Sequence, residues 1–277
     1  MAEFWYRVLD FCHAITESSS NRLLQDFGNV RADRKSDGSL VTESDKWCDR
    51  QIRDAIARTF PDHGILTEET IHILPDNDWC WVVDPIDGTT NFTRGIPIWG
   101  MSLGLLYRGN PVFGFLNFPP LRQVFYGYWS GQTGLVMPKG AYLNERPIQT
   151  SADTPSLNHL FNFCARSIDI LKNPFPCKFR SIGVASYNLA LVACGASIGG
   201  IEATPKIWDI AAVWAILKGA GGTFVHLEPQ SPFPLEIGKN YGSRPFPSLA
   251  LGREDAIATF KPLVGFIGDR VVAKYGI

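Results

Sequence analysis

A strand-like segment that runs into a pair of acids restricts the fold of this chain more than any other feature. Trp79-Cys80-Trp81-Val82-Val83 is short, apolar and rich in residues that favour β-structure, so it predicts a buried strand leading into Asp84. Asp84 and Asp87 stand where this strand ends and a turn opens, with Pro85 stiffening the connection. Two carboxylates at the mouth of an apolar strand repel each other unless a cation lies between them. All-oxygen ligands suit magnesium, so the segment predicts a metal site.

The turn after Asp87 has the residues of a phosphate site. Gly88 lets the backbone approach a ligand closely, and the amides of Gly88, Thr89 and Thr90 would face a phosphate if a helix begins there. Metal ligands and phosphate donors within residues 84–91 indicate phosphoryl chemistry, which depends mostly on positioning and charge neutralisation. The alternative is that these acids cap helix ends or decorate loops. The combination of strand, proline, glycine and paired threonines favours the site.

Acids elsewhere in the chain could complete this site. Glu68 follows another short apolar stretch, in Leu66-Thr67-Glu68-Glu69, and supplies a third carboxylate. Asp209 immediately precedes an apolar-faced helix, where an acid is ordinarily explained by the helix dipole, but a multi-metal site needs a carboxylate from a distant segment. Glu202 lies in an apolar segment after Gly199-Gly200-Ile201. A buried acid is costly, so Glu202 either has a partner or faces a polar ligand, and both readings stay open.

Hydrophobic spacing predicts helices that alternate with strands, which favours a layered α/β or α+β protein. Residues 33–39 are polar and turn-rich, and we expect an exposed loop or hairpin there. We treat residues 1–277 as one domain, with subdomains of about 1–150 and 151–277. The predicted helices lie around residues 5–15, from the Thr42-Glu43-Ser44-Asp45 capping pattern to Pro61, at 187–193, and at 210–217 before Gly219, and the further predicted strands lie at 101–107, 111–116 and 123–129.

The composition excludes several classes of protein. With 277 residues, of which 45% are hydrophobic and 19% charged, the chain is long and apolar enough to bury a globular core. A net charge of −1 gives no support for nucleic acid or an anionic membrane as partner. The six cysteines lack metal-ligand spacing, which indicates free thiols in a reducing compartment. Neither a signal-peptide core nor an apolar run of membrane-spanning length is present, so we expect a soluble, cytoplasmic protein.

Taken together, these residues resemble the inositol monophosphatase family, within the lithium-sensitive, magnesium-dependent phosphatases. One family signature reads here as Trp81-Val82-Val83-Asp84-Pro85-Ile86-Asp87-Gly88-Thr89-Thr90-Asn91-Phe92, and the other as Trp208-Asp209-Ile210-Ala211-Ala212 running to Ala220-Gly221-Gly222. Residues 40–45, the Glu68-Glu69 pair and residues 180–185 match further family segments in order, and the resemblance is thinnest at 151–178 and after 225. It implies a layered α-β-α-β-α sandwich of the inositol monophosphatase and fructose-1,6-bisphosphatase type, usually a homodimer.

The resemblance also implies roles by position. Two or three magnesium ions would be bound, with Asp84 bridging two of them. Glu68, Thr89 and Asp45 would orient and deprotonate the attacking water, in direct in-line hydrolysis without a phosphoenzyme. Lys35 matches a family lysine near the outer metal shell, although its loop position favours a solvated charge. The implied metal ligands are Glu68, Asp84, the carbonyl of Ile86, Asp87 and Asp209, and the implied substrate contacts are Asp87, Gly88, Thr89, Gly183, Val184, Ala185, Glu202 and Asp209.

The substrate is less constrained than the chemistry. The continuation Thr90-Asn91-Phe92, together with Glu202, favours inositol monophosphate, a small phosphorylated metabolite. Val184, Lys218 and the segment 161–166 depart from the family pattern and loosen that assignment. The alternatives within the same chemistry are histidinol phosphate, fructose 1,6-bisphosphate, galactose 1-phosphate and adenosine 3′,5′-bisphosphate. A different class is a binding or regulatory protein on the same fold.

Overall fold

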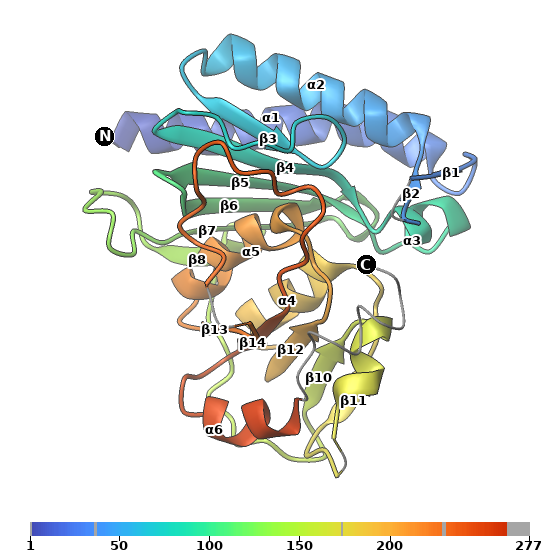
Figure 1. The fold of residues 1–277 in the computed structure, drawn as a ribbon, viewed down its shortest axis with the longest axis vertical. Coiled ribbons are helices and arrows are strands. Elements are labelled where there is room, and N and C mark those ends of the chain that lie inside the picture. Colours follow the sequence, from blue (N-terminus) through green and yellow to red (C-terminus); the bar gives the residue numbers. More distant parts are fainter. Residues whose placement is uncertain (1, 36–37, 173, 229–230, 265–277) are drawn as a thin grey trace.

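Helices and sheets of this chain stack in five layers (Figure 1). The structure is a computed structural model that describes residues 2–35, 38–172, 174–228 and 231–264. Helices α1 and α2 cover one face of a seven-stranded sheet, and α4 and α5 lie between that sheet and a five-stranded one, with α6 on the far side. The layered α-β-α-β-α arrangement expected from the family resemblance is therefore confirmed.

The predicted helices and strands of the first half of the chain are present, but the first helix, expected around residues 5–15, extends from Ala2 to Asp26. The helices are α1 (Ala2–Asp26), α2 (Glu43–Thr59), α3 (Thr89–Arg94), α4 (Ala185–Ala193), α5 (Ile207–Gly219) and α6 (Ile257–Phe260), with short 3-10 turns η1 (Pro119–Leu121), η2 (Ala165–Ile170) and η3 (Lys261–Leu263). The strands are β1 (Asp33–Arg34), β2 (Leu40–Val41), β3 (Gly64–Thr67), β4 (Trp79–Asp87), β5 (Gly100–Tyr107), β6 (Asn110–Phe118), β7 (Gln123–Tyr128), β8 (Gly140–Leu143), β9 (Arg146–Ile148), β10 (Leu160–Phe163), β11 (Lys178–Arg180), β12 (Gly199–Glu202), β13 (Thr223–His226) and β14 (Ser248–Leu251).

The first helical layer forms as its sequence predicts. Trp5, Val8 and Cys12 recur at helical spacing and are buried against the seven-stranded sheet. Helix α2 begins after Thr42, whose hydroxyl accepts bonds from the amides of Ser44 and Asp45, while the Asp45 carboxylate accepts the Thr42 amide. This capping box places the buried side chain of Asp45 at the start of α2, directly after the short hairpin of β1 and β2.

The seven-stranded sheet has the order β3-β4-β5-β6-β7-β8-β9. Its second strand, β4, is longer than predicted, because it continues past Asp84 to Asp87 with a register shift between these two residues. Pro85 lies inside the shift and has no N–H to donate, which explains why regular pairing is interrupted there. The shift places Asp84 and Asp87 at the same end of the sheet.

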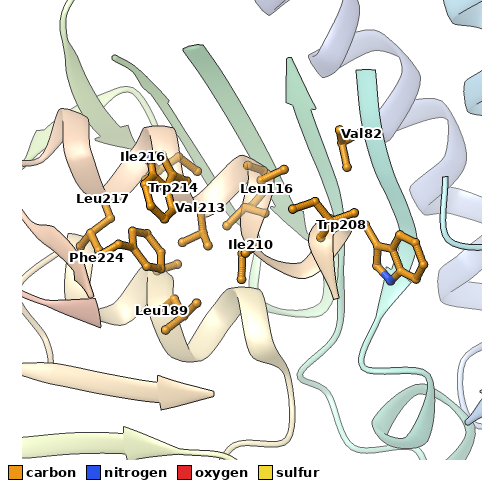
Figure 2. Packing of buried hydrophobic residues seen from close by; sticks show 14 of the residues in the cluster. Val82, Leu116, Leu189, Trp208, Ile210, Val213, Trp214, Ile216, Leu217 and Phe224 are labelled. Carbon is orange, nitrogen blue, oxygen red and sulfur yellow. The ribbon is translucent and has the colours of Figure 1, made fainter. Parts of the chain in front are cut away.

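Helix α5 is the centre of the molecule. Figure 2 shows its apolar side chains, including Ile210, Val213 and Trp214, packed between the strands of the large sheet and the opposite layer. Trp214 stacks on Phe224 of β13, with ring centroids 4.6 Å apart, so α5 joins the two sheets through one continuous core. Its amino-terminal turn comes close to the end of β4.

The five-stranded sheet has the order β11-β10-β12-β14-β13 and mixes parallel and antiparallel pairs. The sequence patterns left all five of these short strands unassigned. Strands β13 and β14 are antiparallel neighbours, but a long connection joins them (Figure 1), and its residues 239–241 bond to residues 72–74, between β3 and β4 of the other sheet.

No helix in the described part of the chain combines the length and the apolar character needed to cross a membrane. All six cysteines are free thiols.

Candidate active site

Carboxylates from separate segments meet where β3, β4 and α5 come together. Asp84 and Asp87 of β4 and Asp209 of α5 each place one carboxylate oxygen within 4.8 Å of the others. Asp84 and Asp87 are buried, and Asp209 is half-buried. Asp209 lies inside the first turn of α5, so the expectation that it precedes the helix is wrong by one turn. The predicted union of Asp209 with the Asp84–Asp87 pair is present in the structure.

Backbone amides hold these three carboxylates in place. The amide of Ile86 donates to Asp84 Oδ1 at 3.0 Å, that of Ser186 to Asp87 Oδ2 at 2.7 Å. Likewise, the amide of Lys206 donates to Asp209 Oδ2 at 2.7 Å. A carboxylate has four lone-pair directions, so one such bond fixes its orientation and still leaves lone pairs for a cation.

Without a cation, the burial of these carboxylates disfavours their ionised form. Burial, together with the charges of Glu68 and neighbouring aspartates, raises the pKa of Asp84 and of Asp209 well above the ordinary value. Burial also raises the pKa of Asp87 to about 6. The cluster offers only oxygen donors, which fit a hard divalent cation such as magnesium or calcium.

Glu68 is held by Lys35 at the edge of the cluster. Lys35 Nζ lies 2.8 Å from Glu68 Oε1 and 2.7 Å from Glu69 Oε1, and its side chain is only 22% exposed. The expectation that Lys35 is a solvated charge is therefore wrong, because the hairpin of β1 and β2 folds it onto the end of β3. Burial lowers the pKa of Lys35, but the two glutamates outweigh it and raise that pKa overall.

Glu69 was not among the predicted site residues. Burial and the charge of Glu68 raise its pKa to about 7, against the opposing effect of Lys35. Its position next to Glu68, after an apolar strand, could have indicated a place in the site. However, two adjacent residues of an extended chain usually point to opposite sides, so a shared site was not expected. The turn after β3 brings both carboxylates to the same lysine.

Thr89 and Asp45 form a polar pair beside the carboxylates. Thr89 Oγ1 lies 3.1 Å from Asp45 Oδ1 and 3.0 Å from the carbonyl oxygen of Ile86. A hydroxyl has a single proton, so it can donate to only one of these oxygens at a time. Burial raises the pKa of Asp45 to about 6, although the donors from Thr42 oppose this shift. Asp45 can therefore exchange a proton near neutral pH.

The turn predicted to bind phosphate opens onto a pocket. Gly88 has φ 95°, a left-handed conformation that favours glycine, and α3 begins at Thr89, as the phosphate-site hypothesis requires. We call this cavity of about 270 Å³ the acidic pocket; its lining includes Glu68, Asp84, Ile86, Asp87, Gly88, Thr89, Thr90, Gly183 and Asp209. It thus contains each predicted metal ligand and the predicted phosphate donors.

The predicted contacts to the alcohol part are less well placed. Gly183 lines the acidic pocket, and Val184 is buried against Gly88, where an added Cβ would lie 2.6 Å from Val184 Cγ2. Val184 and Ala185 are not part of the lining of either pocket described here, and neither is Glu202. For these three residues, contact with substrate stays a prediction.

Glu202 has a partner inside the protein. Its Oε1 accepts a bond of 2.6 Å from Asn188 Nδ2, and the side chain is buried. Burial raises the pKa of Glu202 to about 7. Of the two readings that the sequence left open, the structure shows the paired one.

A second cavity adjoins the first. It has a volume of about 470 Å³, and we call it the basic pocket; its lining includes Lys35, His72, Arg166, Lys206, Asn240 and Ser243. Glu68, Arg166 and Asp209 line both cavities, so the two are continuous. Except for Lys35, none of the six named residues was singled out from the sequence, because they come from four segments that only the tertiary fold brings together.

The metal-free protein is expected to lose stability as the pH rises from about 5 to about 8. In the folded protein, Asp45 and Asp87 have a pKa of about 6, and Glu69 and Glu202 one of about 7, all above the ordinary carboxyl values. Over this range the folded state holds more protons than the unfolded state, so the free energy of unfolding falls as these groups ionise. Thermal unfolding in EDTA at a series of pH values measures this slope.

Two controls accompany that measurement. Magnesium added at about pH 8 should recover the melting temperature, because a bound cation replaces the missing protons. Glu202→Gln keeps an oxygen for Asn188 and removes one titrating group, so it should flatten the slope in EDTA. A melting temperature in EDTA that rises over the same range would contradict the prediction.

Comparison with known proteins identifies relatives of the whole described fold. Residues 11–249 match the family model of the inositol monophosphatase family. The chain is 37% identical over 215 residues to an inositol-1-monophosphatase of Synechocystis sp., covering 73% of this chain and 71% of that protein. It is 34% identical over 217 residues to a fructose-1,6-bisphosphatase/inositol-1-monophosphatase of Aquifex aeolicus, covering 73% and 79%. The solved structure of a Thermotoga maritima IMPase superposes with a TM-score of 0.75 at 25% identity, covering 97% of this chain and 99% of that one.

Proposed function

This chain belongs to the inositol monophosphatase family of metal-dependent phosphoric monoester hydrolases, and we propose that it hydrolyses a small polyol phosphate with magnesium, with inositol monophosphate as the reference substrate. The observation that carries the proposal is the acidic pocket. It joins carboxylates of β4 and α5 to the turn at Gly88 and to the Thr89–Asp45 pair. Phosphoryl transfer needs these three elements together, since it depends on charge neutralisation and positioning.

We propose two or three magnesium ions, held by Glu68, Asp84, the carbonyl of Ile86, Asp87 and Asp209. The donor set supports this, because all five groups offer oxygen, and the buried acids repel one another without a cation. When bound, the ions supply positive charge that offsets the phosphate and lower the pKa of a coordinated water.

Residues of the chain orient the water, accept its proton and hold the phosphate. Thr89 orients the attacking water, and Asp45 accepts a proton through the Thr89 hydroxyl, for which its pKa near neutrality is suited. The backbone amides of Gly88 and Thr89 hold the phosphate for in-line attack. Lys35 keeps Glu68 in place through their ion pair. Catalysis proceeds without a phosphoenzyme in this proposal.

Membership of the family supports further proposals about the domain, the assembly and the location of the protein. We propose that the chain forms a single domain, assembles as a homodimer and is sensitive to lithium. We also propose a cytoplasmic location, because the six free thiols fit a reducing compartment. Histidinol phosphate, galactose 1-phosphate and adenosine 3′,5′-bisphosphate remain the competing substrates. Fructose 1,6-bisphosphate is a further candidate substrate, because one relative is named a fructose-1,6-bisphosphatase/inositol-1-monophosphatase.

A panel of phosphomonoesters tests the function. The purified protein is assayed for phosphate release from each competing compound with magnesium, with magnesium and lithium, and with EDTA. We expect turnover of inositol 1-phosphate that requires magnesium and is inhibited by lithium. A stronger preference for histidinol phosphate or adenosine bisphosphate would change the substrate and keep the mechanism. No turnover of any compound would favour a regulatory protein on this fold.

A further inference from the structure

The turn after β3 carries Glu68, and the threonine at the end of the strand closes it. The amide of Thr67 donates to the carbonyl of Ile71 at 2.8 Å. In return, Thr67 Oγ1 accepts the amides of Thr70 at 3.2 Å and of Ile71 at 3.3 Å, and the Thr67 side chain is buried. Glu68 lies inside this turn, so its position depends on how the turn is held.

A buried carboxylate of α2 anchors the turn from outside. Asp49 is fully buried, and its Oδ2 accepts Thr70 Oγ1 at 3.1 Å and Arg53 Nε at 2.8 Å. Its other oxygen, Oδ1, has no hydrogen-bond donor among the residues that the structure describes. A buried carboxylate with one oxygen unsatisfied is costly, so stability alone explains Asp49 poorly. Since Arg53 belongs to the same helix, the bond to Thr70 is the one that joins Asp49 to another element.

The two threonine hydroxyls can be arranged in only one direction. Their oxygens lie 3.1 Å apart. Thr70 gives its single hydroxyl proton to Asp49, so Thr67 must be the donor between the two hydroxyls. The two lone pairs of Thr67 Oγ1 then remain for the two backbone amides of the turn. Asp49 is therefore the final acceptor that fixes the orientation of both hydroxyls.

Helix α2 connects this turn to the other half of the proposed water site. Asp45 lies one helical turn before Asp49, so the two carboxylates share a face of α2. Asp45 Oδ1 reaches Thr89 Oγ1 at 3.1 Å, and Asp49 reaches the turn that carries Glu68. Thr89 and Glu68 are the groups proposed to act on the attacking water. One helix thus sets the separation between them.

We propose that Asp49 is a positioning residue for Glu68. It acts through the hydroxyls of Thr70 and Thr67 and holds Glu68 in the place from which it would bind magnesium. The inference rests on the proposed function, in which Glu68 is a metal ligand. Asp49 lines neither pocket, so its effect on the metal must pass through the turn. Partners that orient a metal ligand typically change metal affinity or activity by about 10- to 100-fold.

Magnesium binding without substrate, measured by calorimetry, tests this role. Thr70→Val keeps the shape of the side chain and the charge of Asp49 but removes the connecting hydroxyl. Thr70 is an exposed residue, so the core stays intact. We expect the Kd for magnesium to rise about tenfold in Thr70→Val and in Asp49→Ala. Thr70→Ser keeps the hydroxyl and should bind magnesium as the wild type does. The double variant should bind no more weakly than Asp49→Ala, because both changes break the same connection.

Thr133→Val is the matched control. Thr133 Oγ1 donates to the carbonyl of Ser130 in a turn that lines neither pocket. Its replacement removes the same group from another turn. Thermal unfolding in EDTA should show a lower melting temperature in both valine variants, since each loses hydrogen bonds. Only Thr70→Val should also lose magnesium affinity, which separates positioning from a merely structural role.

The outcomes distinguish this inference from the proposed function. Wild-type affinity for magnesium in Thr70→Val overturns the role of Asp49, and so does an equal loss in Thr70→Ser. Losses that add in the double variant overturn the route through Thr70. If the wild type binds magnesium but hydrolyses no phosphomonoester, the proposed function fails and calorimetry still decides on Asp49. If the wild type binds no magnesium, both fail.

Discussion

Replacement of Asp84 by asparagine is expected to lower magnesium-dependent phosphate release by about a thousandfold or more, while it raises the stability of the metal-free protein. Asp84 is buried at the centre of the acidic cluster, and its pKa is raised by burial and by Glu68, Asp87 and Asp209. Asparagine has nearly the same shape and keeps an Oδ1 for the amide of Ile86. The variant therefore removes one negative charge and little packing.

The combination of lost activity and gained stability is the diagnostic result. A variant that merely misfolds loses both, whereas removal of a buried like charge relieves repulsion in the folded state. Phosphate release is measured across a magnesium titration, and thermal unfolding is measured in EDTA. Asp78→Asn, at an exposed aspartate that pairs with Arg108, serves as the matched control and should change neither. An Asp84→Asn enzyme with activity close to wild type would show that the acidic pocket is not the catalytic centre.

Gly114→Ala is expected to destabilise the protein by about 3 kcal/mol or more, a large loss for one added methyl group. An added Cβ at Gly114 would lie 1.9 Å from the carbonyl oxygen of Ala212 in α5, an impossible distance. Backbone atoms of the helix cannot rotate away as a flexible side chain can. Helix α5 must therefore move from the sheet, and Asp209 at its start moves with it.

The cause is a stripe of glycines across the sheet. Gly104, Gly114 and Gly127 are paired in register on β5, β6 and β7, and an added Cβ at each would meet α5 within 3.0 Å. Their missing side chains let the helix approach the sheet closely, as small residues do wherever backbones pack tightly. The stripe links the packing of the core to the position of the metal site.

Thermal unfolding and magnesium affinity measure the effect of Gly114→Ala. We expect the melting temperature to fall by roughly 10 °C and the magnesium dependence to weaken. Gly200→Ala is the control, because Gly200 is also a strand glycine but its added Cβ would make only ordinary contacts, the nearest at 3.4 Å. Equal stability of the two variants would contradict the role of the stripe.

Local patterns predicted the part of the site that is contiguous in the chain. The strand leading into Asp84, the turn at Gly88 and the cap of α2 at Thr42 follow from residue types within a few positions of one another. The motif could not reveal the register shift that carries β4 to Asp87, because the shift depends on pairing with β5. All five strands of the smaller sheet escaped prediction, since short segments lack enough positions to show a period.

Long-range contacts decided the remaining residues. The loop position of Lys35 suggested solvent, yet the fold brings it to Glu68 and Glu69 from more than thirty positions away. Glu202 looked equally suited to ligand or partner until α4 placed Asn188 against it. For both residues the deciding neighbour lies on another element, and no periodicity along the chain encodes it.

The sequence by itself determined the chemistry of this protein: oxygen ligands in one octapeptide, a phosphate-binding turn, and distant acids of the kind a metal site needs. Which groups can bind a metal or a phosphate depends on the types of side chain, and the sequence gives these types directly. The tertiary structure alone decided which of those groups meet, how deeply each is buried, and that a basic pocket of Arg166 and Lys206 opens beside the acidic one. Burial and proximity set pKa values and ligand fit, and both arise only when separate segments pack together.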